Sequence, residues 1–176
     1  FVLDMLPEDN YRQKVLKGPD QFNRERTLVD SGYHHQYMRN TLQLNRSVAA
    51  DSSLIFSEQA QLSGISNTDW SWAPLLADFD NDGLKDIFIT NGYLRDFSNL
   101  DFTNYTVNEA ISEAQQNHTN VDIGLLVSKM SSTQVSNYIY QNKGEAHFEN
   151  KTAAWGFEKK TVSNAAAYAD FDNDGD

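Results

Sequence analysis

The chain has 176 residues, of which 25 are acidic and 14 basic, so its formal net charge at pH 7 is −11. This balance argues against partners such as nucleic acid or an anionic membrane surface, because both attract faces rich in lysine and arginine. Apolar residues make up 39% of the sequence, too many for a disordered acidic segment. The absence of cysteine excludes disulfides, thiolate zinc sites and a cysteine nucleophile.

The N-terminal part of the chain predicts one short helix over residues 7–17. Pro7 stands at a favoured first helical position, acidic residues follow it in the first turn, and Gly18-Pro19 ends the helix. No run of apolar residues approaches the length of about 20 that spans a membrane. The chain opens on Phe1 rather than Met, so we expect it to be part of a longer protein.

Short apolar runs further along the chain predict the strands of a β structure. They lie at 41–44, 75–77, 87–90 and 138–141. Asn142-Lys143-Gly144 predicts a hairpin turn that leads to Phe148, and Asn91-Gly92 marks another turn. The second and third of these strands flank an acidic loop.

Between residues 95 and 134 the pattern changes from strand to helix. Thr106 and Glu109 form a capping box that predicts a helix to Gln116, and a second helix is expected over 121–130. The side chains expected to be buried are Ile111, Leu125, Leu126 and Met130. Because lengthening a loop costs little closure entropy, we interpret the segment as an insertion into a loop of the β structure.

The chain contains an internal repeat. A shift of 92 residues aligns 56–83 with 148–175 without a gap, and both segments end in ADFDNDG. Just upstream, NTLQLN at 40–45 resembles NYIYQN at 137–142. Without the helical insertion the period is about 50 residues, in the range of a four-stranded propeller blade.

The aspartates of the repeat predict a metal site. Asp78, Asp80, Asp82 and Asp86 occupy positions 1, 3, 5 and 9 of a loop with glycine at position 6, and the carbonyl of Leu84 follows the glycine. Ca²⁺ takes six to eight oxygen ligands at about 2.3–2.6 Å, whereas Mg²⁺ prefers fewer protein ligands and retained water. The loop therefore predicts calcium, whose charge offsets the repulsion between the carboxylates.

An EF-hand needs a bidentate glutamate at position 12 and flanking helices, but Ile89 stands at position 12 inside a predicted strand. D-x-D-x-D-G-x-x-D between two strands instead resembles the calcium loop of the FG-GAP/VCBS repeat family of integrin-α-type β-propellers. DFDNDGLKDIFITNG, preceded by WSWAPLLA, is similar to the bacterial surface proteins that resemble cartilage acidic protein (the ASPIC/UnbV group). The resemblance covers about residues 40–176. It implies calcium ligands in two loops: the side chains of Asp78, Asp80, Asp82 and Asp86 with the carbonyl of Leu84, and then the side chains of Asp170, Asp172 and Asp174 with the carbonyl of Asp176.

We therefore expect an all-β fold of partial β-propeller blades with a short α-helical insertion. The expected domains are an N-terminal segment with a short helix (1–39), a first repeat with its calcium loop (40–94), the helical insertion (95–134) and a second repeat (135–176). Because sites of this kind suit the millimolar calcium outside cells, we expect an extracellular or cell-surface protein.

The leading functional hypothesis is a non-enzymatic module for adhesion or for binding a protein or glycan partner. The alternatives are a calcium-dependent enzyme that acts on polysaccharide through residues outside this chain, and an accessory subunit of an outer-membrane complex. Neither G-x-S-x-G, H-E-x-x-H nor a phosphate-binding glycine loop is present.

Two further patterns allow a functional and a structural interpretation. His34-His35 could bind a transition metal, but neighbours on a strand point to opposite faces, which disfavours a shared ion. Trp70 and Trp72 could stack on a carbohydrate, although their place before the calcium loop favours core packing.

Overall fold

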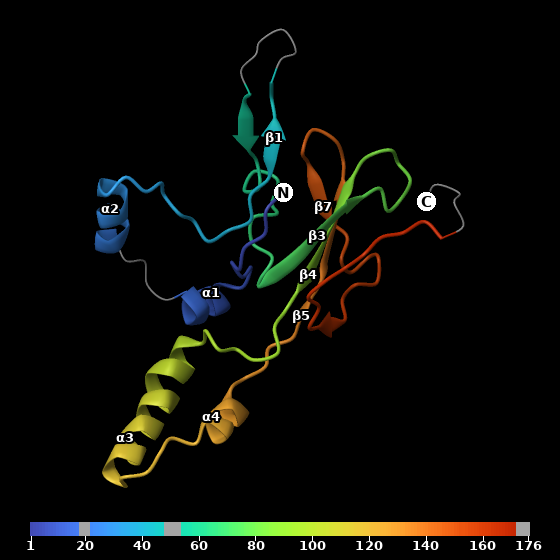
Figure 1. Cartoon of the computed structure of the whole chain (residues 1–176). Coiled ribbons are helices and arrows are strands. Elements are labelled where there is room, and N and C mark those ends of the chain that lie inside the picture. Colours follow the sequence, from blue (N-terminus) through green and yellow to red (C-terminus); the bar gives the residue numbers. More distant parts are fainter. Residues whose placement is uncertain (18–21, 48–53, 172–176) are drawn as a thin grey trace. The chain divides into compact units, whose positions relative to one another are not determined.

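The computed structural model describes residues 1–17, 22–47 and 54–171 of the chain (Figure 1). The helical elements are α1 (Asn10–Lys17), α2 (Phe22–Asp30), the π-helical turn η1 (Phe102–Val107), α3 (Asn108–Gln116) and α4 (Ile123–Lys129). The strands are β1 (Gln43–Asn45), β2 (Phe56–Glu58), β3 (Ser71–Ala77), β4 (Asp86–Asn91), β5 (Val135–Ser136), β6 (Tyr138–Asn142), β7 (Phe148–Asn150) and β8 (Lys160–Thr161). None of the helices in the described ranges is long and apolar enough to cross a membrane.

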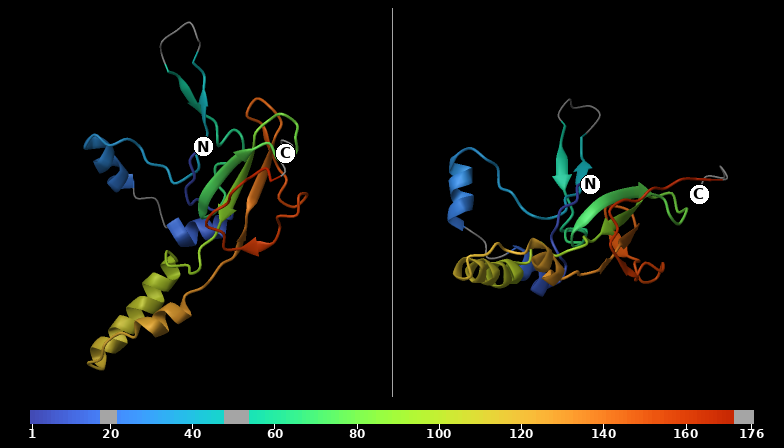
Figure 2. Two further views of the ribbon diagram at one scale, coloured as in Figure 1. Left: turned by 45° about the vertical axis from the view of Figure 1, so that its right-hand side comes forward. Right: turned by 60° about the horizontal axis from the view of Figure 1, so that its bottom comes forward.

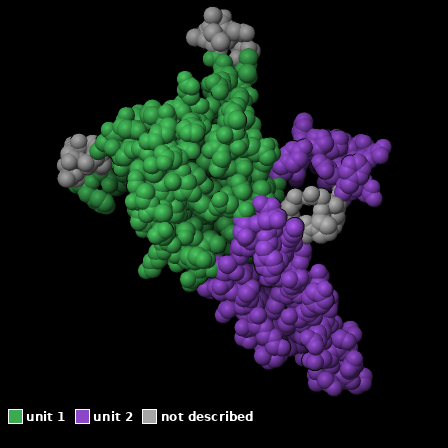
Figure 3. Space-filling view, turned by 180° about the vertical axis from the view of Figure 1, so that it is seen from behind, with its two compact units in different colours: residues 1–8, 38–93, 134–176 green, residues 9–37, 94–133 purple. Residues whose placement is uncertain are grey.

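The chain divides into two compact units (Figure 3). Unit 1 comprises residues 1–8, 38–93 and 134–176, and contains the described strands. Unit 2 comprises residues 9–37 and 94–133, and contains the described helices. The expectation of an all-β fold is therefore too narrow, because helices cover more of the described residues than strands do.

The main sheet of unit 1 has four antiparallel strands in the order β3-β4-β6-β7, which remain side by side in both views of Figure 2. β4 is central and almost wholly buried, as its β-branched and aromatic residues favour. β3 lies at an edge, where Pro74 is tolerated because its missing N–H removes no hydrogen bond of a central ladder. The smaller sheets are β1-β2 and β5-β8.

The sequence repeat has a structural counterpart in the strand pairing. β1 pairs with β2 so that Gln43 faces Glu58, and β6 pairs with β7 so that Tyr140 faces Asn150. The sequence alignment superimposes these two pairs. The following turn is also shared: Ile65 N–H donates to the Ala60 carbonyl at 2.9 Å, as Phe157 N–H donates to the Thr152 carbonyl at 2.8 Å. The two copies therefore fold with one register.

The repeat extends to the N-terminal residues, which the sequence patterns did not reveal. Val2 and Thr41 exchange two backbone hydrogen bonds of 2.9 Å in an antiparallel bridge. Thr41 is the counterpart of Tyr138, which faces Ile89 across β4 and β6. Val2 thus corresponds to Ile89, and a helical segment follows this position in both copies.

The two copies share a hydrophobic core. The first copy contributes Leu42, Ala60, Ile65, Ile87 and Ile89, and the second contributes Tyr140. Ile87 and Tyr140 face each other across β4 and β6, so they lie on one face of the main sheet. On the opposite face, Phe88 packs its ring 5.1 Å from that of Phe157. Both faces of the sheet are consequently apolar.

A run of hydrogen-bonded polar side chains also crosses unit 1, and we name it the polar ladder. Its members are short amide and hydroxyl side chains at or near strand ends: Asn40, Thr68, Ser71, Asn91, Asn137 and Ser163. Asn91 is fully buried and its N–H donates to the side-chain oxygen of Asn137 at 2.9 Å. Such a ladder satisfies polar groups that burial would otherwise leave without partners.

The helices differ from their predicted limits. α1 begins after Asp9, whose side chain accepts the Arg12 N–H at 2.8 Å, and not at Pro7. The capping box at Thr106 is wrong, because α3 continues from η1 and has no side-chain cap. An earlier residue takes that role: Asn99 accepts the Phe102 N–H at 3.0 Å through its side chain.

The predicted buried side of the helical insertion at 95–134 is confirmed only in part. Leu126 is buried, but Ile111 and Leu125 are 40% and 54% exposed. In α3 the buried residue is Ala114 and not Ile111. α2 was not predicted, and none of its described residues is buried.

Candidate metal centre

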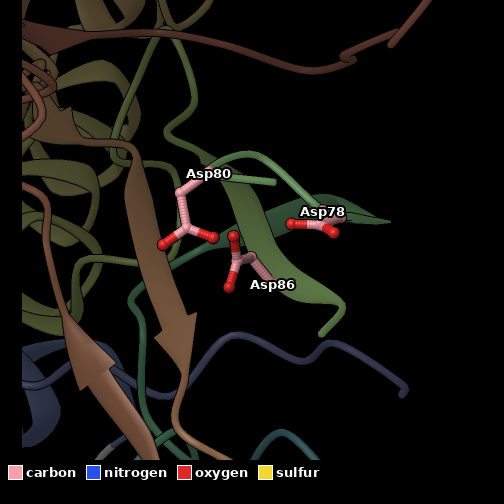
Figure 4. A group of neighbouring side chains, drawn as sticks. All are labelled: Asp78, Asp80 and Asp86. Carbon is pink, nitrogen blue, oxygen red and sulfur yellow. The ribbon is translucent and has the colours of Figure 1, made fainter. Parts of the chain in front are cut away.

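The loop between β3 and β4 brings three carboxylates together. Asp78, Asp80 and Asp86 each offer an oxygen, and these oxygens lie within 4.8 Å of one another. Figure 4 shows the carboxylates of Asp80 and Asp86 turned toward each other, with that of Asp78 pointing toward them. Because antiparallel β3 and β4 pair directly up to Ala77 and Asp86, the ends of the loop are held close.

Asp86 is the most rigidly placed of the three. It is fully buried at the first position of β4. One carboxylate oxygen accepts the Phe79 N–H at 3.1 Å and the other accepts the Asn142 N–H at 2.8 Å. The side chain is thus fixed by the loop on one side and by β6 on the other.

Burial raises the pKa of Asp86 above its ordinary value of 3.8. The hydrogen bonds from the backbone of Asn142 and Phe79 lower the pKa, and the negative charges of Asp80 and Asp82 raise it further. A group with a raised pKa binds more protons in the folded than in the unfolded chain. A cation bound in the loop would lower the pKa of Asp86, because it favours the ionised carboxylate.

This shift gives a testable pH dependence. With divalent cations chelated, the folding stability that Asp86 contributes should fall as the pH rises from 3.8 through the higher pKa of the folded chain, since the folded state favours the protonated form. Asp86→Asn mimics that form and removes the dependence. The measurement is the difference in unfolding free energy between wild type and Asp86→Asn, from urea titrations across the acid range. A difference that does not change with pH contradicts the assignment.

Asp78 organises the backbone of the loop. Its two carboxylate oxygens accept the N–H groups of Asp82, at 3.1 Å, and Gly83, at 2.8 Å. Gly83 has a φ of 87°, a left-handed conformation that glycine adopts without strain. The glycine of the motif is therefore required by the turn that places Asp80 opposite Asp86.

One predicted side-chain ligand of this loop, Asp82, lies outside the converging group, whereas the carbonyl ligand expected at Leu84 stays a prediction. The side chain of Asp82 accepts the Leu84 N–H at 2.8 Å, and Asp82 is not among the three carboxylates that meet. Leu84 is exposed at the loop surface. In the second loop Asp170 is exposed, whereas Asp172, Asp174 and Asp176 lie outside the described residues.

β6 supplies two residues that the sequence analysis missed. The side-chain amide of Gln141 donates to Asp80, and the side-chain amide of Asn142 donates to the Lys85 carbonyl at 2.9 Å. A faint signal existed, because Asn45 and Asn142 match in the two copies. The contact itself depends on strand order, which the local pattern does not contain.

The donor set fits a hard cation. It consists of carboxylate oxygens, which are the ligands preferred by Ca²⁺, Mg²⁺ and Mn²⁺, while soft metals favour thiolate or thioether sulfur. Three converging carboxylates, one of them fully buried, repel one another unless a cation or protons compensate their charge. The arrangement can therefore hold a metal ion.

The histidine and tryptophan pairs have other contacts. Nδ1 of His35 lies 2.9 Å from a carboxylate oxygen of Glu25, and its ring stacks on Tyr37. The indole N–H of Trp72 donates to the Gly92 carbonyl at 2.6 Å, although 46% of Trp72 is exposed. The structure thus places Trp72 at the surface of the sheet.

The chain was compared with protein-family models, with curated proteins and with solved structures. No family model, curated protein or solved structure matches it.

Proposed function

We propose that the chain is part of a calcium-stabilised β-propeller of the FG-GAP/VCBS type, which binds a protein or glycan partner outside the cell. The observation that carries the proposal is the convergence of Asp78, Asp80 and Asp86 within 4.8 Å in a loop between two antiparallel strands. The bound ion has a structural role in this proposal, and the chain is not an enzyme.

The proposal prefers calcium to magnesium because the loop motif offers several oxygen donors to one ion. Hydrogen bonds to Asp78 make the loop compact, and its carboxylates come from the loop and from the first residue of β4. Ca²⁺ accepts six to eight oxygens in flexible geometry, whereas Mg²⁺ demands a near-ideal octahedron and keeps several waters. Millimolar calcium outside cells is sufficient for extracellular sites, which bind with Kd of about 10⁻⁴–10⁻³ M.

The propeller assignment is supported by the way the two copies meet. The strands β3, β4, β6 and β7 form one four-stranded antiparallel sheet, as in a blade, and their order in the sheet is their order in the sequence. Only β5 and the helical insertion lie between β4 and β6 in the sequence. Leu42, Ala60 and Ile65 of the first copy pack on one face of that sheet. Ile139 and Phe157 are the counterparts of Leu42 and Ile65, and they lie with Phe88 on the other face of the sheet. This fits a further blade stacked on that face in the same manner.

The test is the response of thermal unfolding to calcium. Calcium chloride should raise the Tm and EGTA should lower it, because a ligand that binds only the folded state stabilises by about 2.7 kcal/mol at one hundred times its Kd. The double variant Asp80→Asn, Asp86→Asn should lose this response. Differential scanning calorimetry measures the Tm, and isothermal titration measures the binding.

Glu145→Gln is the control, because it removes an exposed acidic charge outside the loop and should retain the full response. A Tm of wild type that is insensitive to both calcium and EGTA contradicts the proposal. Equal responses of the double variant and the control place the ion elsewhere.

A further inference from the structure

A shallow groove lies in unit 1 at the end of the main sheet opposite to the aspartate loop. Its volume is about 480 Å³, and it is lined by Ser136, Tyr138, Asn150, Thr152, Ala153 and Glu158. Tyr138 begins β6 and Asn150 ends β7, whereas Asp86 contacts the far end of β6 at Asn142. The groove is therefore separate from the candidate metal centre.

Some polar groups of the lining already form hydrogen bonds within the protein. The Ser136 hydroxyl donates to the Glu158 carbonyl at 2.9 Å, and the Asn150 side-chain oxygen accepts the Thr152 N–H at 2.9 Å. The Thr152 hydroxyl oxygen accepts the Ile139 N–H at 3.2 Å. These hydrogen bonds fix the positions of the side chains and leave part of their hydrogen-bonding capacity unused.

The lining groups that can still form hydrogen bonds are neutral donors and one carboxylate. Within the described ranges, no hydrogen bond engages the side-chain NH₂ of Asn150 or the carboxylate of Glu158. The hydroxyl of Thr152 can still donate its hydrogen. The groove thus presents neutral donors beside a carboxylate acceptor, and its lining contains no lysine, arginine or histidine.

Tyr138 adds an aromatic side chain of fixed orientation. Its ring stacks parallel to that of Tyr140, with centroids 5.8 Å apart and planes 7° from parallel. Its hydroxyl donates to a carboxylate oxygen of Glu8 at 2.7 Å. Burial and the hydrogen bond to Glu8 raise the pKa of Tyr138 above its ordinary value of 10.0, so the phenol stays a neutral donor to Glu8.

We propose that this groove binds a neutral glycan. Sugar hydroxyls both donate and accept, so they match the Glu158 carboxylate and the Asn150 amide together, and the Tyr138 side chain adds apolar area to the lining. The absence of basic side chains from the lining disfavours phosphates and acidic sugars. The volume lies within the range of about 300–1,000 Å³ that small-molecule sites occupy. This inference rests on the proposed binding function and identifies one ligand class for it.

The experiment is an NMR titration of the whole chain in millimolar calcium. Maltotetraose, cellotetraose and mannotetraose are added singly, with glycerol as the small-polyol control. At least one tetrasaccharide should give saturable shifts of the Asn150 side-chain NH₂ and of the Thr152 amide, and glycerol none. Asn150→Asp keeps the oxygen that accepts the Thr152 N–H but removes the NH₂ donor, and Glu158→Gln removes the charged acceptor. Each should weaken binding about tenfold, because each loses a hydrogen bond to the ligand.

Glu149→Gln is the matched control, since Glu149 is exposed on β7 but does not line the groove. It should bind with the wild-type Kd. The inference is overturned if none of the three tetrasaccharides gives saturable shifts, or if both groove variants bind as the control does. A calcium titration of the same sample separates the two proposals: calcium binding without glycan binding overturns this inference alone, and glycan binding without calcium binding overturns the metal assignment alone.

Discussion

Replacing Ile89 by alanine should lower the free energy of unfolding by about 2–5 kcal/mol, the range found when a large aliphatic side chain is removed from a packed core. Ile89 is fully buried in the core that the two copies of the repeat share. The loss combines the transfer free energy of the deleted methyl and methylene groups with the cavity they leave. Because domains are stable by only about 5–15 kcal/mol, the variant should lose a large part of its stability.

Urea unfolding in the presence of calcium measures this effect. Leu62→Ala is the control, because Leu62 belongs to the same unit but is 85% exposed. Its unfolding free energy should change by no more than about 0.5 kcal/mol. A loss for Ile89→Ala as small as that of the control would show that the two copies do not pack as described.

Replacing Gly92 by alanine should cost about 2–5 kcal/mol, from two separate causes. Gly92 has a φ of 105°, and a left-handed conformation costs a residue with a side chain about 1–2 kcal/mol. An added Cβ would also lie 3.0 Å from the Thr161 carbonyl oxygen and 3.2 Å from the Cα of Val162. Both contacts are with backbone, so relieving them requires shifts of the kind that cost about 1–3 kcal/mol.

Gly144→Ala separates the two causes. Gly144 has a similar φ of 87°, but a Cβ there would meet nothing within 4 Å. This variant should show only the conformational cost of about 1–2 kcal/mol. Urea titrations of both variants give the comparison. Equal losses at the two positions would mean that the segment at Thr161 does not lie against Gly92.

The strands were the most predictable part of the fold. The runs at 75–77 and 87–90 became β3 and β4 because they are apolar, short and bounded by turn residues, and all three properties are local. The bridge between Val2 and Thr41 was missed because its partners are far apart in sequence and form no extended run. α2 was missed because its nine residues include only three apolar ones, Phe22, Leu28 and Val29.

The candidate site was predictable in its residue types and less so in its geometry. The spacing of the aspartates identified a loop with oxygen donors, and three of them converge. Spacing alone does not determine that Asp82 turns to the Leu84 N–H, since this depends on the backbone conformation of the turn. The contribution of Asn142 depends on β6 pairing with β4 after an insertion of about forty residues.

The polar ladder has a consequence for how unit 1 unfolds. Asn40 of the first copy is bonded to Thr68, and the ladder continues through Ser71 and Asn91 to Asn137 of the second copy. Opening one copy alone would leave buried amides and hydroxyls of the other without hydrogen-bond partners, each at a cost of about 1–3 kcal/mol. Partly open states are therefore penalised, and we expect the two copies to unfold cooperatively in one transition. The backbone N–H of Asn91, fully buried within this ladder, should then exchange its hydrogen with solvent only when the whole unit opens.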